Sequence, residues 1–270
     1  RKGFSMKIGL ISDSLRQGFE ESIKTAAKLG VSGVQKYLTT GEFSAENMTP
    51  SKIKEIKDIM DSNGLVFSAI CGDFGVDFDD PGCVDRSKKV LDAAKELGCN
   101  IVTTHIGHLY ETEDKRMELI RKHARELAEY ADSIGSYFAA ETGTEKASVL
   151  KAFLDSLGAK GLRVNYDPAN LVMVAGDDPV QGVYILKEYI VHTHAKDGIK
   201  TTATPHGWQE VPLGQGGVDF DKYLAALNDI GYTGYLTIER EVGENPAADI
   251  AMAVDFLKEK LAKLNIKLEK

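Results

Sequence analysis

Short runs of β-branched and aromatic residues alternate with longer amphipathic stretches from one end of the chain to the other. Strand and helix patterns that alternate in this way indicate parallel strands joined by right-handed helical crossovers. The predicted strands are eight runs, at 6–12, 33–38, 65–71, 100–105, 137–141, 162–167, 190–194 and 234–239.

The amphipathic stretches between these runs carry the residue types that begin and end helices. Thr49 can cap a helix whose first residue is Pro50. Glycines at helix ends adopt the left-handed conformation that stops a helix, and they are expected here at Gly30, Gly64, Gly98, Gly135, Gly161 and Gly231. The predicted helices are 19–29, one from 50 onward, 86–97, 114–133, 145–157, 178–188, 219–230 and 246–264. The segment from 194 to 217 is predicted to be a long polar connection.

An open doubly wound sheet would give the same alternation, but no glycine-rich phosphate loop follows the first strand run. Eight strand–helix units and a length of 270 residues are typical of a closed barrel. We therefore predict an α/β fold, a single (β/α)8 TIM barrel formed by residues 6–270. Residues 1–5 precede Met6, where the first strand run starts, and we interpret them as a remnant of cloning.

The composition argues against several classes of partner. A net charge of −8 disfavours a broad basic face for nucleic acid. No apolar run approaches the roughly 18 residues of a membrane helix, and no secretion leader precedes the first strand. The three cysteines have no metal-binding spacing and fit a reducing compartment. We expect a cytoplasmic protein that acts on a small molecule, with no nucleic-acid or membrane partner.

Four of the later strand runs end in ionisable residues. One such residue could lie on the surface one step beyond its strand, but the carboxyl ends of barrel strands all open at one mouth. Three carboxylates meeting there would repel one another without a counter-charge. We therefore predict one divalent ion per chain, bound by Glu141, Asp167, His194 and Glu239. Three oxygen ligands and one nitrogen favour Mn²⁺, with Mg²⁺, Co²⁺ and Zn²⁺ as alternatives.

Motifs along nearly the whole chain resemble those of one family: "MKIGLIS", "VTTHIGH", "AAETGT", "NYDPANL", "VHTHAKD", "VPLGQGGVDF" and "GYLTIERE". The chain is similar to the sugar phosphate isomerase/epimerase family, the xylose isomerase-like barrels that include ketose 3-epimerases, inosose dehydratases and endonuclease IV. The resemblance places the family's metal ligands on the same four residues. It implies that Glu141 and Glu239 transfer protons on opposite sides of a substrate carbon, while Asp167 and His194 act only as ligands.

The resemblance implies a metal-dependent isomerase or epimerase of a keto sugar or sugar derivative. Proton abstraction next to the metal-bound carbonyl would give an enediolate. The alternative is a lyase that starts from the same enediolate and then dehydrates the sugar or cleaves a 3-oxo glycoside by β-elimination. A barrel subunit without activity is disfavoured by the complete ligand set. A nuclease is also disfavoured, because Cys71 and Asn170 stand where endonuclease IV carries histidines. Relatives often form dimers or tetramers, so a homo-oligomer is expected.

Five further residues are candidates for contact with the carbohydrate substrate: His105, His108, Asn170, Lys196 and Trp208. The two histidines could instead be hydrogen-bonded residues of the barrel mouth. Asn170 replaces a histidine that contacts substrate in many relatives.

Other polar residues of the mouth could have structural roles only. Lys196 could form an ion pair with Asp197, and the tryptophan could anchor its loop. His192 is predicted to point inward one layer deeper than His194, in a structural role. Tyr37 and Asp73 end the second and third strands, and we assign them no role.

Overall fold

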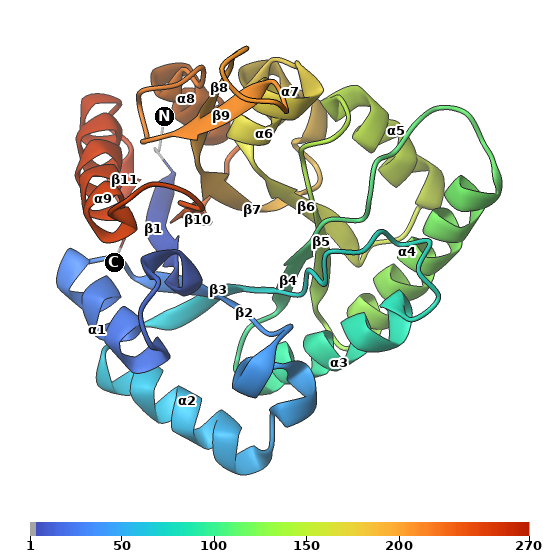
Figure 1. Ribbon diagram of the computed structural model, residues 1–270, viewed down its shortest axis with the longest axis horizontal. Helices are drawn as coiled ribbons and strands as arrows, with labels where there is room; N and C mark the ends of the chain where they lie inside the picture. Colours follow the sequence, from blue (N-terminus) through green and yellow to red (C-terminus); the bar gives the residue numbers. More distant parts are fainter. Residues whose placement is uncertain (1–3, 270) are drawn as a thin grey trace.

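The computed structural model describes residues 4–269, and they form a closed barrel of parallel strands inside a ring of helices (Figure 1). The barrel strands are β1 Ser5–Ile11, β2 Gly33–Tyr37, β3 Val66–Cys71, β4 Ile101–Thr104, β5 Tyr137–Glu141, β6 Leu162–Tyr166, β7 Ile190–Ala195 and β10 Tyr235–Ile238. Each barrel strand pairs with the next barrel strand along the chain, and β10 pairs back to β1 with Ile8 opposite Leu236. The prediction of a (β/α)8 barrel is confirmed.

The predicted helices are all present and lie outside the barrel (Figure 1). They are α1 Phe19–Leu29, α2 Pro50–Ser62, α3 Cys83–Glu96, α4 Lys115–Ser133, α5 Ala147–Leu157, α7 Pro179–Leu186, α8 Phe220–Asp229 and α9 Pro246–Lys263. Shorter helical turns occur at η1 Ser12–Leu15, η2 Gly41–Phe43, η3 Ala45–Asn47, α6 Pro168–Asn170 and η4 Leu171–Ala175. Thr49 caps α2 as predicted, since its side chain accepts a hydrogen bond from the Lys52 N–H at 3.2 Å. No helix within residues 4–269 is long and apolar enough to cross a membrane.

Five of the six predicted helix-ending glycines have the left-handed conformation, and Gly161 does not. Gly158 ends α5 instead, with φ of 59°. Gly161 is required for a different reason, because a Cβ at this position would collide with the backbone carbonyl of Ala128 on α4. The prediction at Gly161 was wrong, since a close backbone approach and a helix stop both select glycine.

The predicted polar connection after β7 contains a hairpin that the sequence patterns did not predict. β8 Asp197–Lys200 pairs antiparallel with β9 Trp208–Val211. The Asp197 carboxylate accepts hydrogen bonds from four backbone N–H groups, at Gly198, Gly214, Gly216 and Val218, and so ties the hairpin to the loop that follows it. These short strands lie outside the barrel and carry mainly polar residues, so they lack the apolar alternation that marks a strand in sequence. A further short strand, β11 Lys267–Leu268, pairs with β1 at Ser5 and Met6.

The barrel interior below its mouth is polar, whereas the space between strands and helices is filled by apolar side chains. We call the interior set the lower layer. Each member lies two residues before a residue of the candidate site or of the cavity above it, both described below. His192 lies between Asn165 and Thr237, with hydrogen bonds of 2.8 Å to Asn165 Oδ1 and to Thr237 Oγ1. This arrangement confirms the deeper, structural position predicted for His192. The lower layer consists of Gln35, Thr103, Asn165, His192 and Thr237, each at most 1% exposed.

Candidate metal centre

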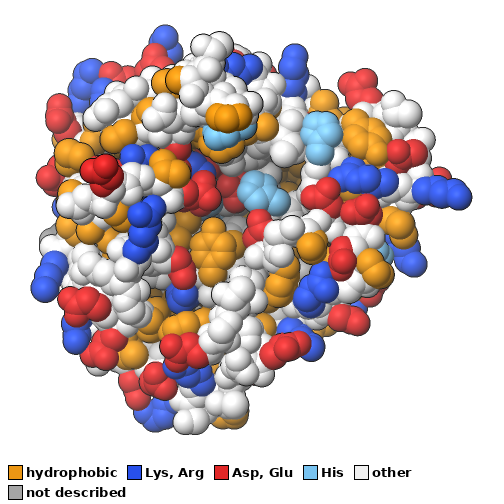
Figure 2. Space-filling view, in the orientation of Figure 1, with side chains coloured by type: hydrophobic (Ala, Val, Ile, Leu, Met, Phe, Trp, Pro, Cys, Tyr) orange, Lys and Arg blue, Asp and Glu red, His pale blue; other side chains and the backbone are white. Residues whose placement is uncertain are grey.

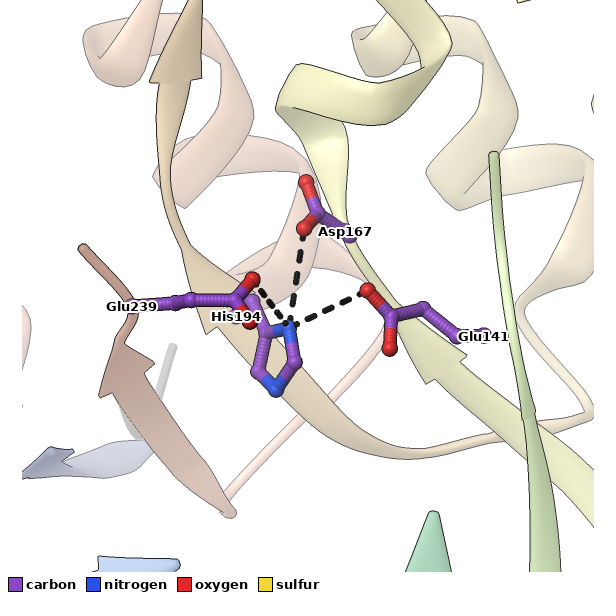
Figure 3. A group of neighbouring side chains, drawn as sticks. All are labelled: Glu141, Asp167, His194 and Glu239. Carbon is purple, nitrogen blue, oxygen red and sulfur yellow. Dashed lines mark ion pairs between the residues drawn. The ribbon is translucent and has the colours of Figure 1, made fainter. Parts of the chain in front are cut away.

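Four ionisable side chains meet at the carboxyl ends of the later barrel strands (Figure 3). Glu141 ends β5, His194 lies near the end of β7, and Asp167 and Glu239 directly follow β6 and β10. Each offers one ligand atom, and these atoms lie within 4.8 Å of one another. His194 Nδ1 is 3.5 Å from Glu141 Oε1, 3.5 Å from Asp167 Oδ2 and 3.2 Å from Glu239 Oε2. We call these four residues the site layer.

Two atoms of the site layer are buried without any hydrogen-bond partner, Asp167 Oδ2 and His194 Nδ1. Asp167 is 0% exposed and His194 is 1% exposed. An unsatisfied buried polar atom costs free energy, so such a pair marks a place for a ligand. A divalent cation between the two atoms would satisfy both, and three carboxylates with one imidazole suit a hard or borderline metal. The residues present therefore fit a metal ion.

Neighbouring groups use the other atom of each of these two side chains. His194 Nε2 lies 2.9 Å from Gln35 Oε1, so an N–H on Nε2 leaves the lone pair of Nδ1 directed at the carboxylates. Asp167 Oδ1 accepts hydrogen bonds from the N–H groups of Ala169 and Asn170 at the start of α6, which leaves Oδ2 directed into the site. Both side chains are held so that one atom faces the centre of the cluster.

Burial and neighbouring charged residues together set the pKa values of the site layer. Burial lowers the pKa of His194, but Glu239 and Glu141 outweigh that effect and hold it well above the usual value. Burial raises the pKa of Asp167, and Lys196 offsets only part of the rise. Burial also raises the pKa of Glu239, yet Lys196 and His194 together hold it below the usual range. Neighbouring charge thus sets the direction of the pKa shift at His194 and Glu239, whereas burial sets it at Asp167.

A cavity of about 170 Å³ opens above the site layer. Figure 2 shows this hollow near the middle of the face, with acidic side chains around a histidine. Three of the predicted substrate contacts line it. Asn170 Nδ2 donates to Glu141 Oε1 at 3.2 Å, and His105 Nε2 lies 3.6 Å from Glu141 Oε2. Lys196 Nζ lies 3.0 Å from Glu239 Oε2 and 2.5 Å from Glu241 Oε2, and so does not pair with Asp197.

The other two predicted contacts lie elsewhere. His108 is exposed, and its ring centroid is 6.1 Å from that of Tyr110. Trp208 belongs to β9 and packs on His206 with ring centroids 4.2 Å apart. Neither residue lines the cavity above the site layer. A larger cavity of about 340 Å³ lies on the outside of the barrel between α4 and α5, and none of the predicted site residues lines it.

Three acidic or aromatic residues of the cavity wall were not assigned from sequence: Tyr37, Asp73 and Glu241. Tyr37 ends β2, and Asp73 comes two residues after β3. Their position at strand ends was the available signal, the same one that identified the site layer. Glu241 lies two residues beyond Glu239, where only the pairing with Lys196 reveals its relation to the site.

The chain belongs to the xylose isomerase-like TIM barrel family, whose model matches residues 23–260. A xylose isomerase domain protein from Planctomyces limnophilus has the same fold, with a TM-score of 0.83 and 25% identity over 97% of this chain and 99% of that one. A 3-keto-D-glucoside 4-epimerase from E. coli superposes with a TM-score of 0.73 at 18% identity, over 94% of this chain and all of its own, which shows the fold alone.

Among curated proteins, an L-ribulose-5-phosphate 3-epimerase from Salmonella typhi is 40% identical over 77 residues, which are 28% of this chain and 25% of the epimerase. The chain thus spans about a quarter of the length of the curated relatives that it matches. The chain thus combines the xylose isomerase-like barrel with a buried candidate metal site.

Proposed function

We propose that the protein is a divalent-metal-dependent isomerase or epimerase of a keto sugar or sugar derivative. The observation that carries the proposal is the unpartnered pair of Asp167 Oδ2 and His194 Nδ1, buried between two glutamates in a barrel of this family. A divalent ion held by the site layer would supply a Lewis acid that stabilises negative charge on a substrate carbonyl oxygen.

Two glutamates do the proton transfer in this proposal. Glu239 and Glu141 approach the centre of the site from opposite sides (Figure 3). One glutamate, as the carboxylate, would remove the proton from the carbon next to the carbonyl. The other, as the carboxylic acid, would donate its own proton to the opposite face, which inverts that carbon and exchanges the protonation states of the two glutamates. Lys196 lowers the pKa of Glu239, so this glutamate is ionised and able to accept a proton at neutral pH.

The surrounding residues position the glutamates and the substrate. Asn170 holds Glu141 through Oε1, and Lys196 holds Glu239 through Oε2. His105 lines the cavity beside Glu141 and is placed to contact a sugar hydroxyl. Mn²⁺ is our choice of metal, because the oxygen-rich ligand set with one imidazole suits it. The cytoplasmic location and a homo-oligomeric state stay predictions.

A lyase is the second candidate function, and the position of His105 in the cavity favours it. A lyase needs a general acid near a leaving group. His105 lines the cavity, with Nε2 3.6 Å from Glu141 Oε2, whereas Lys196 is paired with two glutamates and His108 lies outside the cavity. Replacing His105 by Asn should therefore abolish elimination but leave proton exchange on carbon in place.

Incubation in D₂O with metal-loaded protein tests the proposal. Keto sugars and 3-oxo sugar derivatives that turn over should gain deuterium next to the carbonyl, as measured by NMR. An epimerase places the label in the product, whereas a lyase with reversible abstraction places it in recovered substrate. Because a shielded base can return the same proton, substrate deuterated at that carbon is measured in parallel. Turnover with neither wash-in nor a primary isotope effect would contradict the proposal.

A further inference from the structure

Four of the twelve residues that line the cavity above the site layer are acids, against one lysine and one histidine. Asp73, Glu141, Glu239 and Glu241 all line it, and Asp167 lies buried beneath them. A divalent ion neutralises two of these five negative charges. The mouth therefore stays acidic with the metal in place.

The cations of the cavity wall are already engaged. Of the lining residues, all within the described part of the chain, only Lys196 and His105 can carry positive charge. Lys196 Nζ contacts Glu239 Oε2 at 3.0 Å and Glu241 Oε2 at 2.5 Å, with Asp167 Oδ2 at 3.9 Å. His105 faces Glu141. Neither is left to bind an anionic group of a substrate.

Nearby arginines and the nearest helix N-terminus are occupied as well. Arg16 donates to the backbone carbonyls of Glu241 and Gly243, and Arg240 is paired with Glu210 and Asp249. The first N–H groups of α6 donate to Asp167 Oδ1. Phosphate sites in proteins are built from arginine or lysine side chains or from free N–H groups at a helix start. These groups have partners within the protein here.

We propose that the substrate is an uncharged sugar or glycoside without a phosphate group. This inference rests on the proposed function and specifies its substrate class. A phosphate monoester carries a charge of about −1.5 to −2 at neutral pH and would face the acidic mouth without a compensating cation. Sugar hydroxyls, in contrast, donate hydrogen bonds to carboxylates. Asp73 and the half-exposed Glu241 offer such acceptors on the cavity wall, and Tyr37 offers an aromatic face.

Matched pairs of ketoses test the inference. D-fructose and D-fructose 6-phosphate, and D-ribulose and D-ribulose 5-phosphate, are incubated with Mn²⁺-loaded protein in D₂O, and the rate of carbon deuteration is measured. Because like charges at the acidic mouth oppose association, the unphosphorylated member should exchange at least about tenfold faster. The difference should shrink as salt is added, since salt screens exposed charges. Faster exchange of the phosphorylated members would overturn this inference and leave the proposed function intact.

Binding of sugar alcohols separates failure of this inference from failure of the proposed function. Sorbitol and sorbitol 6-phosphate cannot lose a proton next to a carbonyl, so calorimetry with them reports recognition alone. Tighter binding of sorbitol together with ketose turnover that shows neither carbon exchange nor a primary isotope effect would support the charge preference and refute the isomerase proposal. Equal or tighter binding of the phosphate, or no binding of either, would overturn the charge preference.

A pair of variants tests whether the charge of the cavity wall causes the difference between the two exchange rates. Asp73→Asn removes one negative charge from the cavity wall and keeps the oxygen that accepts a hydrogen bond from the Gly75 N–H. It should narrow the ratio of the two exchange rates by about twofold to threefold through reduced repulsion. Glu259→Gln removes the same charge from the exposed side of α9 and should leave the ratio unchanged. Equal effects of the two variants would show that the charge of the mouth does not select the substrate.

Discussion

The barrel interior holds two neighbouring layers of polar side chains that differ in how fully they are hydrogen-bonded. In the lower layer, both nitrogens of His192 have partners at 2.8 Å, and the Gln35 amide contacts both His194 and Thr103. In the site layer, where Asp167 and His194 each stand two residues after a member of the lower layer, Asp167 Oδ2 and His194 Nδ1 have no hydrogen-bond partner. Both layers are buried, so solvent does not explain the difference.

The contrast shows what each layer contributes. A satisfied polar network fixes side-chain positions and costs little, whereas an unsatisfied one costs stability unless a ligand completes it. The lower layer therefore orients the site layer, and in our proposal a bound cation completes the site layer. Substitutions in the two layers should therefore affect different properties of the protein, namely turnover, metal affinity or stability. The following experiments test that difference.

The largest effect is expected from the two glutamates. Glu141→Gln and Glu239→Gln keep the side-chain shape but remove the base, so turnover should fall by about 10²–10⁴-fold. Excess metal should restore metal occupancy in both variants without restoring turnover, as judged by metal analysis beside steady-state rates. A metal-loaded glutamine variant with near wild-type turnover would remove that glutamate from the proton transfer.

The two residues with unpartnered atoms should act through metal binding. Asp167→Asn and His194→Ala remove a ligand atom, so metal affinity measured by calorimetry should fall by more than the roughly 10–100-fold typical of outer hydrogen-bond partners. Chelation should lower the melting temperature of the wild-type protein and change that of these variants much less, because bound metal stabilises only the folded state. Metal analysis that finds no divalent ion in wild-type protein at neutral pH would contradict the site.

The residues of the site layer could be found from sequence because each stands directly at the end of a strong strand pattern. In a barrel that position alone fixes where the side chain lies. Glu141 and Glu239 follow apolar runs that leave little freedom in the strand register. The same logic gave the fold, since the apolar periodicities of strands and helices are strong and local.

The wall of the cavity could not be derived in this way. The sequence does not show that Lys196 turns toward Glu239 and Glu241 rather than toward Asp197, because that choice depends on the hairpin of β8 and β9. Gln35 looks like a surface residue of the second strand, and only barrel closure brings it to His194, far along the chain. Contacts of this kind depend on side-chain direction across distant strands, which single-sequence patterns do not carry.

Gln35 links the two layers and should have an intermediate effect. Gln35→Leu removes the acceptor for His194 Nε2–H, so metal affinity should fall by about 10–100-fold. Gln35→Glu keeps an acceptor oxygen and should retain most of the affinity. Nitrogen chemical shifts of His194 should show the proton on Nε2 in wild type and in Gln35→Glu, and a mixture of tautomers in Gln35→Leu. Unchanged tautomers together with equal affinity losses would mean that Gln35 acts only through packing.

The smallest effects concern the stability of the metal-free protein. A substitution in the lower layer should lower the free energy of unfolding, whereas one in the site layer should not. His192→Phe leaves Asn165 Oδ1 without a partner and Thr237 Oγ1 with only Ser68 Oγ at 3.4 Å, and should lower the free energy of unfolding by about 1–3 kcal/mol. Asp167→Asn should not lower it. The pKa of Asp167 is raised on folding, chiefly by burial, so the ionised carboxylate is destabilising at neutral pH. Asparagine removes that charge and keeps the oxygen that accepts from Ala169 and Asn170.

Urea unfolding at pH 7 with chelator present measures both variants against wild type. A loss of stability in Asp167→Asn as large as that in His192→Phe would show that the site layer is as fully satisfied as the lower layer, and that the protein does not require a cation there.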